Sequence, residues 1–125
     1  MPDNDAFEES FRRLRTVLRR HADNLVVTKD EPALYYLDTA HVMKNKKPLY
    51  FGSVQIRKRY VSFHLMPVYV FPDLLEPVSP DLMKRMQGKS CFNFTAISDG
   101  HLAELERLTA AGFTRYRSEN LLGTP

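Results

Sequence analysis

His64 and Cys91 are the two residues of this chain whose side chains could do chemistry together. An imidazole that contacts a thiol can act as the base that activates a nucleophile. The sequence does not require such a contact, because one histidine and one cysteine occur somewhere in most chains of this length. We therefore predict that His64 makes hydrogen bonds, either within the protein or to a ligand, and that it is not a catalytic base.

Other motifs for catalysis, metals or nucleotides are missing from the sequence. The four histidines form no HxH or HExxH spacing, and a single cysteine cannot build a thiolate zinc site. The five glycines form neither a GxGxxG pattern nor a P-loop. Asp73, Glu76 and Asp81 lie in a proline-rich stretch, where carboxylates more often cap helices or face solvent than bind an ion. We predict no enzymatic activity, no cofactor and no metal site.

Length, composition and charge predict a soluble cytoplasmic protein. The 125 residues, of which 43% are hydrophobic and 26% charged, fit one globular domain over 1–125. A single cysteine excludes an internal disulfide and fits a reducing compartment. The acidic start of the chain lacks the apolar core of a signal peptide, and no apolar run approaches the ~20 residues of a membrane span.

Basic residues gather at three places: five arginines within 12–20, the run 57–59, and a looser group of lysines within 44–47. The first group continues an amphipathic pattern and indicates the solvated face of a helix. The second precedes Tyr60, and aromatic residues among cations can hold a nucleic-acid backbone and stack on its bases. No RNP box or GXXG loop accompanies them, and the net charge is only +3. We expect neither a nucleic-acid nor a membrane partner.

The hydrophobic pattern predicts helices and strands in alternation. The predicted elements are a helix over 6–22, strands over 25–28 and 33–37, a loop over 38–47, strands over 48–56 and 59–66, a helix from Pro80 through Met86 capped by Ser79, a strand over 89–96, and a helix capped by Ser98 and ended by Gly112. Leu102, Leu105 and Leu108 of the last helix should face the core. This order predicts an α+β fold, a two-layer sandwich in which helices cover one mainly antiparallel sheet of about five strands.

The strands 48–56 and 59–66 should form a hairpin, joined by Arg57-Lys58 or by a longer loop with an even number of residues. Side chains alternate between the faces of a sheet, so any even loop sorts them in the same way. The core face would hold Tyr50, Gly52, Val54, Ile56, Val61, Phe63 and Leu65. The semi-polar face would hold Phe51, Ser53, Gln55, Tyr60, Ser62 and His64, joined by Cys91 and Asn93 if their strand adjoins.

The stretch FGSVQIRKRYVSFHLMPVYVFPDLL, followed by LMKRMQGKSCFNFTAI and ELERLTAAGFTRY, resembles the YdhG-like family of small bacterial proteins, a domain of unknown function. The resemblance is densest over 51–116, and the motifs VSFHLMP and GKSCFNF carry it. It implies a compact α/β sandwich. Some members of the family are described as frataxin-like intracellular iron chaperones, so the resemblance implies at most iron delivery by loosely placed carboxylates.

Three functions follow as hypotheses. The first is a non-enzymatic binding module whose ligand site comprises Ser62, His64, Lys89, Cys91 and Asn93. Lys89 is included because it follows Gly88, where a small anion could reach backbone amides. The second is a homodimeric interaction protein that buries the same face against a copy of itself. The third is an iron chaperone, for which the arginine-rich first helix, the scattered acids and the positive net charge predict weak binding of iron.

Overall fold

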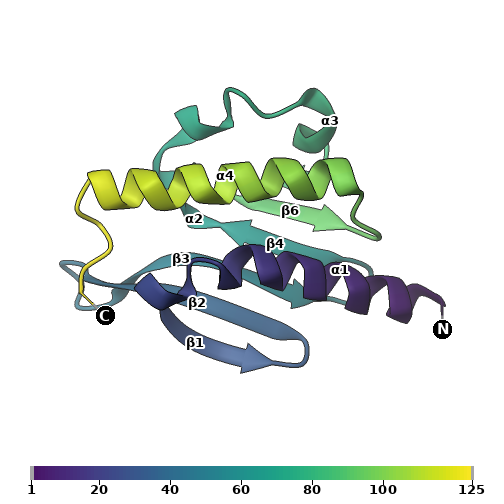
Figure 1. Ribbon diagram of the computed structural model, residues 1–125, viewed down its shortest axis with the longest axis horizontal. Coiled ribbons are helices and arrows are strands. Elements are labelled where there is room, and N and C mark those ends of the chain that lie inside the picture. The colour runs from purple at the N-terminus through teal and green to yellow at the C-terminus, as the bar shows by residue number, and fades with distance from the viewer. Residues whose placement is uncertain (1, 125) are drawn as a thin grey trace.

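The computed structural model describes residues 2–124 and has the predicted α+β architecture. Six strands form one open antiparallel sheet in the order β1-β2-β3-β4-β6-β5. The two long helices, α1 and α4, lie side by side on the same face of this sheet (Figure 1). The elements in chain order are α1 (Pro2–Arg19), η1 (Ala22–Asn24), β1 (Val26–Glu31), β2 (Leu34–Val42), β3 (Pro48–Ile56), β4 (Val61–Leu65), α2 (Met66–Val70), η2 (Pro72–Leu75), α3 (Pro80–Met83), β5 (Met86–Gln87), β6 (Cys91–Phe94) and α4 (Asp99–Ser118).

Helix α1 buries the apolar stripe that its sequence predicts. The side chains of this stripe are at most 7% exposed and comprise Phe7, Phe11, Leu14 and Leu18. Full burial of one such side chain stabilises the fold by about 1.5–3 kcal/mol. The helix spans Pro2–Arg19 instead of the predicted 6–22. Residues 22–24 form a separate 3-10 turn.

Arg13 of α1 and Arg20, immediately after its end, hold this helix against α4 and the segment before it. Arg13 donates to the main-chain oxygen of Ile97 at 3.2 Å and forms an ion pair with Asp99. Arg20 forms an ion pair with Glu106 at 3.0 Å. The arginine run is therefore only partly a solvated face. Exposed ion pairs of this kind contribute about 0–1 kcal/mol each, so they orient the helices more than they stabilise them.

Strand β2 continues through residues 38–42, which the sequence analysis assigned to a loop. Its second half is polar, but its residues find hydrogen-bond partners in β3 and in the C-terminal tail. Thr39 donates from Oγ1 to the main-chain oxygen of Leu49 at 2.8 Å, and the amide of Ala40 donates to the main-chain oxygen of Leu122 at 2.9 Å. The C-terminal tail thus supplies a hydrogen bond that the local sequence does not reveal.

The β3–β4 hairpin has the predicted register. Ile56 pairs with Val61, which leaves a four-residue connection at 57–60 and confirms an even-numbered loop. Val54 pairs with Phe63, and both are fully buried beneath the helices. Their sequence neighbours Ser53, Gln55, Ser62 and His64 therefore lie on the opposite face, which we call the open face.

The start of β3 contradicts the predicted faces of Tyr50 and Phe51. On β2, Leu37 pairs with Gly52 but the next residue, Asp38, pairs with Tyr50, so Phe51 is an extra residue on the β3 side. Such a bulge interrupts the alternation of side chains. Phe51 consequently packs into the core, where it is fully buried, and Tyr50 lies on the open face.

The part of the chain after β4 differs from its prediction at several points. Ser79 caps α3 as predicted, because its Oγ accepts from the amide of Leu82 at 3.1 Å. The helix ends at Met83 rather than at Met86. Met86 instead pairs with Phe92, so residues 86–87 form the short edge strand β5. The predicted strand 89–96 is shorter, spanning Cys91–Phe94.

Helix α4 runs through Gly112, where we expected it to end. Gly112 instead serves close packing, because a Cβ at this position would lie 2.8 Å from Cβ of Pro67 in α2. Leu105 and Leu108 are buried as predicted, whereas Leu102 is only partly buried. Within residues 2–124, α4 and the other helices are all too short or too polar to cross a lipid bilayer.

Candidate functional site

The open face carries two rows of polar side chains that cross the central strands. Strand pairing places Ser53, His64 and Cys91 in one row over β3, β4 and β6. The same registers place Gln55, Ser62 and Asn93 in the second row. All six side chains are partly buried, although α1 and α4 pack on the other face. The polar groups therefore shield one another from water.

A rigid layer of apolar side chains lies directly behind these rows. The alternate residues of the same three strands include Val54, Val61, Phe63 and Phe92, each with no exposed surface. Because a packed core resists displacement, the strands hold the Cα atoms of the polar residues in fixed positions. The strands thus provide a preorganised surface.

His64 is held in place by a neighbouring hydroxyl and an aromatic ring. Its Nε2 lies 2.5 Å from Oγ of Ser90, which is 6% exposed. The ring of Tyr50 meets the imidazole edge-on, with centroids 5.4 Å apart. Burial lowers the pKa of His64 below its ordinary value of 6.5, because the charged form loses hydration. At neutral pH this side chain is an uncharged hydrogen-bonding group.

Cys91 contacts a hydroxyl and an amide rather than the imidazole of His64. Its Sγ lies 2.7 Å from Oγ of Ser62 and 3.5 Å from Oδ1 of Asn93. Activation of a thiol needs a cation, a base or a helix N-terminus beside the sulfur. The contacts of Cys91 instead support a hydrogen-bonding role within the rows.

Two stacked tyrosines border the rows on the β2 side. The rings of Tyr36 and Tyr50 are 4.7 Å apart at their centroids and 21° from parallel, and the Tyr50 hydroxyl bonds Ser53. Burial raises the pKa of both phenols, so they stay protonated donors. Beyond them, Asp38 accepts from Oγ1 of Thr28 at 2.9 Å, and burial raises the pKa of its carboxyl.

The structure brings together four of the five predicted site residues: Ser62, His64, Cys91 and Asn93. Lys89 does not join them. It is exposed in the turn between β5 and β6, and its ammonium lies 6.0 Å from the ring centroid of Tyr69 in α2. The turn directs the Lys89 side chain toward α2.

The sequence did not predict two residues of the site. Tyr50 was assigned to the core face, and only the bulge beside Phe51 brings it to His64. Ser90 precedes the regular part of β6, and its contact with His64 depends on the β5–β6 turn. Its position immediately before Cys91 was the only available signal, and alternation would have placed Ser90 on the other face.

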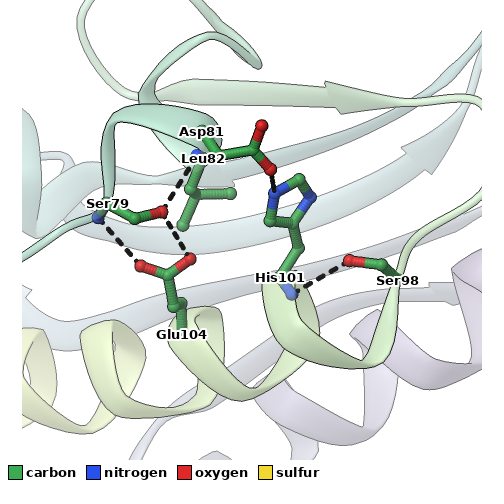
Figure 2. Close-up of polar contacts among 6 residues, drawn as sticks. All are labelled: Ser79, Asp81, Leu82, Ser98, His101 and Glu104. Carbon is green, nitrogen blue, oxygen red and sulfur yellow. Dashed lines mark hydrogen bonds and ion pairs between the residues drawn. The ribbon is translucent and has the colours of Figure 1, made fainter.

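A second polar cluster joins α3 to α4 on the helical side of the molecule (Figure 2). The carboxylate of Glu104 accepts from both the amide and the hydroxyl of Ser79, at 2.9 and 2.8 Å. His101 Nε2 lies 2.6 Å from Oδ2 of Asp81. Ser98 accepts from the amide of His101 and so caps α4 as predicted. The main-chain N–H of Ser79 lowers the pKa of Glu104.

The contacts of this second cluster join two helices and differ from those of a catalytic triad. Ser98 meets the backbone of His101 rather than its imidazole, and Ser79 is bound to Glu104. The cluster fixes the segment between β4 and β6 against α4. Among the side chains that the structure describes, no three His, Cys, Asp or Glu residues are grouped closely enough to hold a metal ion.

The chain was also compared with protein-family models, with curated proteins and with solved structures. None of the three comparisons gave a match, so the resemblance to the YdhG-like family stays a prediction.

Proposed function

We propose that this protein is a non-enzymatic binding module that holds a small, planar, hydrogen-bonding ligand on the open face of its sheet. The observation that supports this function is the pair of polar rows over β3, β4 and β6. Their side chains are partly buried and mutually bonded, as in the contacts of Cys91 with Ser62 and of His64 with Ser90.

The chemistry of the rows suits a ligand better than it suits bulk solvent. A sheet face that only meets water usually carries lysine, glutamate and other charged side chains. The rows instead present hydroxyls, amides, a thiol and a neutral imidazole. When a ligand replaces water at an uncharged group, the hydrogen bond to water is lost and one to the ligand is made. The net cost in free energy is therefore small. The Tyr36–Tyr50 stack adds an aromatic border for a flat ligand.

The same composition makes the two other hypotheses weaker. Interfaces of stable homodimers are about 65% apolar, whereas the middle of this face is occupied by polar side chains such as Ser62 and Asn93. Iron delivery requires clustered oxygen ligands. Of the acids on β1 and β2, Asp38 is bonded to Thr28 and Glu31 pairs with Lys29.

Nuclear magnetic resonance with uncharged probes tests this function. Adenosine and uridine are suitable because each has a flat ring with hydrogen-bonding edges and no charge. We expect one of them to shift amide signals of β3, β4 and β6. His64→Ala should abolish these shifts at a cost of about 1 kcal/mol in stability, as for one lost hydrogen bond.

His41→Ala is the matched control, because His41 is also a partly buried strand histidine but lies near the β2–β3 turn. It should leave the shifts unchanged. Shifts that map to α4 or the C-terminal tail, or no shift with either nucleoside at millimolar concentration, would show that the open face is not the binding surface.

A further inference from the structure

A hollow at the β3–β4 turn adjoins the open face and has its own chemistry. It measures about 630 Å³, opens to solvent, and is lined by Gln55, Ile56, Arg57, Lys58, Arg59 and Tyr60. Sites for small molecules commonly enclose about 300–1,000 Å³. Three consecutive cations therefore line an open hollow large enough for a ligand group.

The three cations of this turn are among the basic residues that form no ion pair with the side chains that the structure describes. Arg13, Arg20 and Arg115 each form an ion pair with a carboxylate. Among the side chains of residues 5–124, no carboxylate lies within ion-pair distance of the run 57–59. The polar contact of Arg57 is a long one, 3.4 Å to Oε1 of Gln55. An anion in the hollow would meet positive charge that nothing else neutralises.

Gln55 connects the hollow to the polar rows. Its side chain lines the hollow, and its strand position pairs with Ser62, which in turn pairs with Asn93. One ligand can therefore place an anionic group among the cations and an uncharged body over the second row. The hollow and the rows form one continuous surface.

We propose that this surface recognises a phosphomonoester, with the phosphate in the hollow and the uncharged part over Gln55, Ser62 and Asn93. The proposal rests on the proposed function and adds the ligand class to it. A phosphomonoester carries a charge near −2 at neutral pH and three strong acceptor oxygens, which match three clustered donors. A polyanion is less suitable, because the β1–β2 side of the face carries Asp38 and Glu31.

Calorimetry with three probes separates the two parts of the surface. The probes are adenosine 5′-monophosphate, adenosine and inorganic phosphate. We expect the monophosphate to bind at least about tenfold more tightly than adenosine, the effect of one or two charge-assisted hydrogen bonds. In a variant with Arg57→Gln, Lys58→Gln and Arg59→Gln, the monophosphate should bind no better than adenosine.

The matched control replaces the three lysines of the β2–β3 turn, Lys44→Gln, Lys46→Gln and Lys47→Gln. This variant loses the same net charge from exposed turn residues at the other end of β3, so its affinity for the monophosphate should equal that of the wild type. A similar loss in both variants would show only long-range attraction and would overturn the phosphate site.

The remaining outcomes distinguish the two proposals. Equal affinities for adenosine and its monophosphate would overturn the phosphate site and leave the open face as the binding surface. Tight binding of the monophosphate that Ser62→Ala and Asn93→Ala do not weaken would overturn the role of the open face. Binding of a single-stranded oligonucleotide that exceeds that of the monophosphate and falls steeply with salt would replace the small ligand by nucleic acid.

Discussion

Burial favours the uncharged form of two histidine side chains in this protein. His64 lies among polar neighbours on the open face, and His21 stacks on Phe113 with ring centroids 4.9 Å apart. Loss of hydration lowers the pKa of both imidazoles, and the charge of Arg20 further lowers that of His21. Both histidines therefore favour the neutral form in the folded protein more than they do in the unfolded chain.

The stability of the protein should therefore fall as the pH decreases through the ordinary histidine value of 6.5. Below that pH the unfolded chain binds a proton at each histidine more readily than the folded protein, so unfolding is favoured. Urea midpoints measured between about pH 5 and 8 test this. His64→Gln should reduce the slope, and Asn93→Ala, a neighbour that does not titrate, should not. An unchanged slope in His64→Gln would contradict the burial argument.

The structure also ranks the core side chains that the sequence treated alike. Phe63 and Leu105 are fully buried, whereas Leu102 is partly exposed. We expect Phe63→Ala to lower the free energy of unfolding by about 3–5 kcal/mol and Leu105→Ala by about 2–5 kcal/mol. Leu102→Ala should cost only about 1 kcal/mol. Chemical denaturation of the three variants measures these values, and equal losses for Leu102 and Leu105 would refute the ranking.

At the level of elements, α4 supports the fold through contacts along its whole length. Its first turns hold α3 through Glu104 and His101, and its middle packs on α2 at Gly112. Its last turns bury Tyr116, whose hydroxyl donates to the main-chain oxygen of Tyr50 at 3.1 Å. Because Tyr50 belongs to the bulged start of β3, this bond couples the helix to the strand that brings Tyr50 to the open face.

The two glycines of α4 should respond in opposite ways to alanine. A Cβ at Gly112 would lie 2.8 Å from the rigid ring of Pro67, so Gly112→Ala should destabilise the protein by about 1–3 kcal/mol despite its better helix propensity. Gly100 has no heavy atom near its Cβ position. Gly100→Ala should therefore stabilise the protein by about 0.5 kcal/mol. Thermal unfolding compares the two, and a stabilising Gly112→Ala would contradict the packing.

At the level of the whole molecule, the two faces of the sheet carry side chains of different polarity. One face is covered by helices and holds the apolar core, and the other presents the polar rows. Cations exceed acids, with a net charge of +3. At long range this charge attracts anions and repels metal ions.

Iron should consequently bind weakly or not at all. The side chains that the structure describes contain no cluster of three or more metal-ligating residues, and the net charge opposes cation approach. Calorimetry with ferrous iron under anaerobic conditions is the direct measurement. A saturable isotherm in the low-micromolar range would contradict this prediction and favour the chaperone hypothesis.

Several features of the fold were determined by the sequence itself because they depend on neighbouring residues only. Alternation along residues 61–65 and 91–94 was enough to assign the faces of His64 and Cys91. The helix caps at Ser79 and Ser98 were predicted correctly because a cap depends on the residue type at the first turn.

The remaining features were decided by tertiary contacts. The bulge that exchanges Tyr50 and Phe51 places Phe51 against Phe113 and Tyr116 of α4, contacts that the sequence of β3 does not reveal. Helix α4 continues past Gly112 to Phe113 and Tyr116, which are buried against Phe51, a residue far away in the sequence. Local patterns determine which residues can form an element and which face they share. Contacts between distant segments determine where that alternation is broken and which side chains meet there.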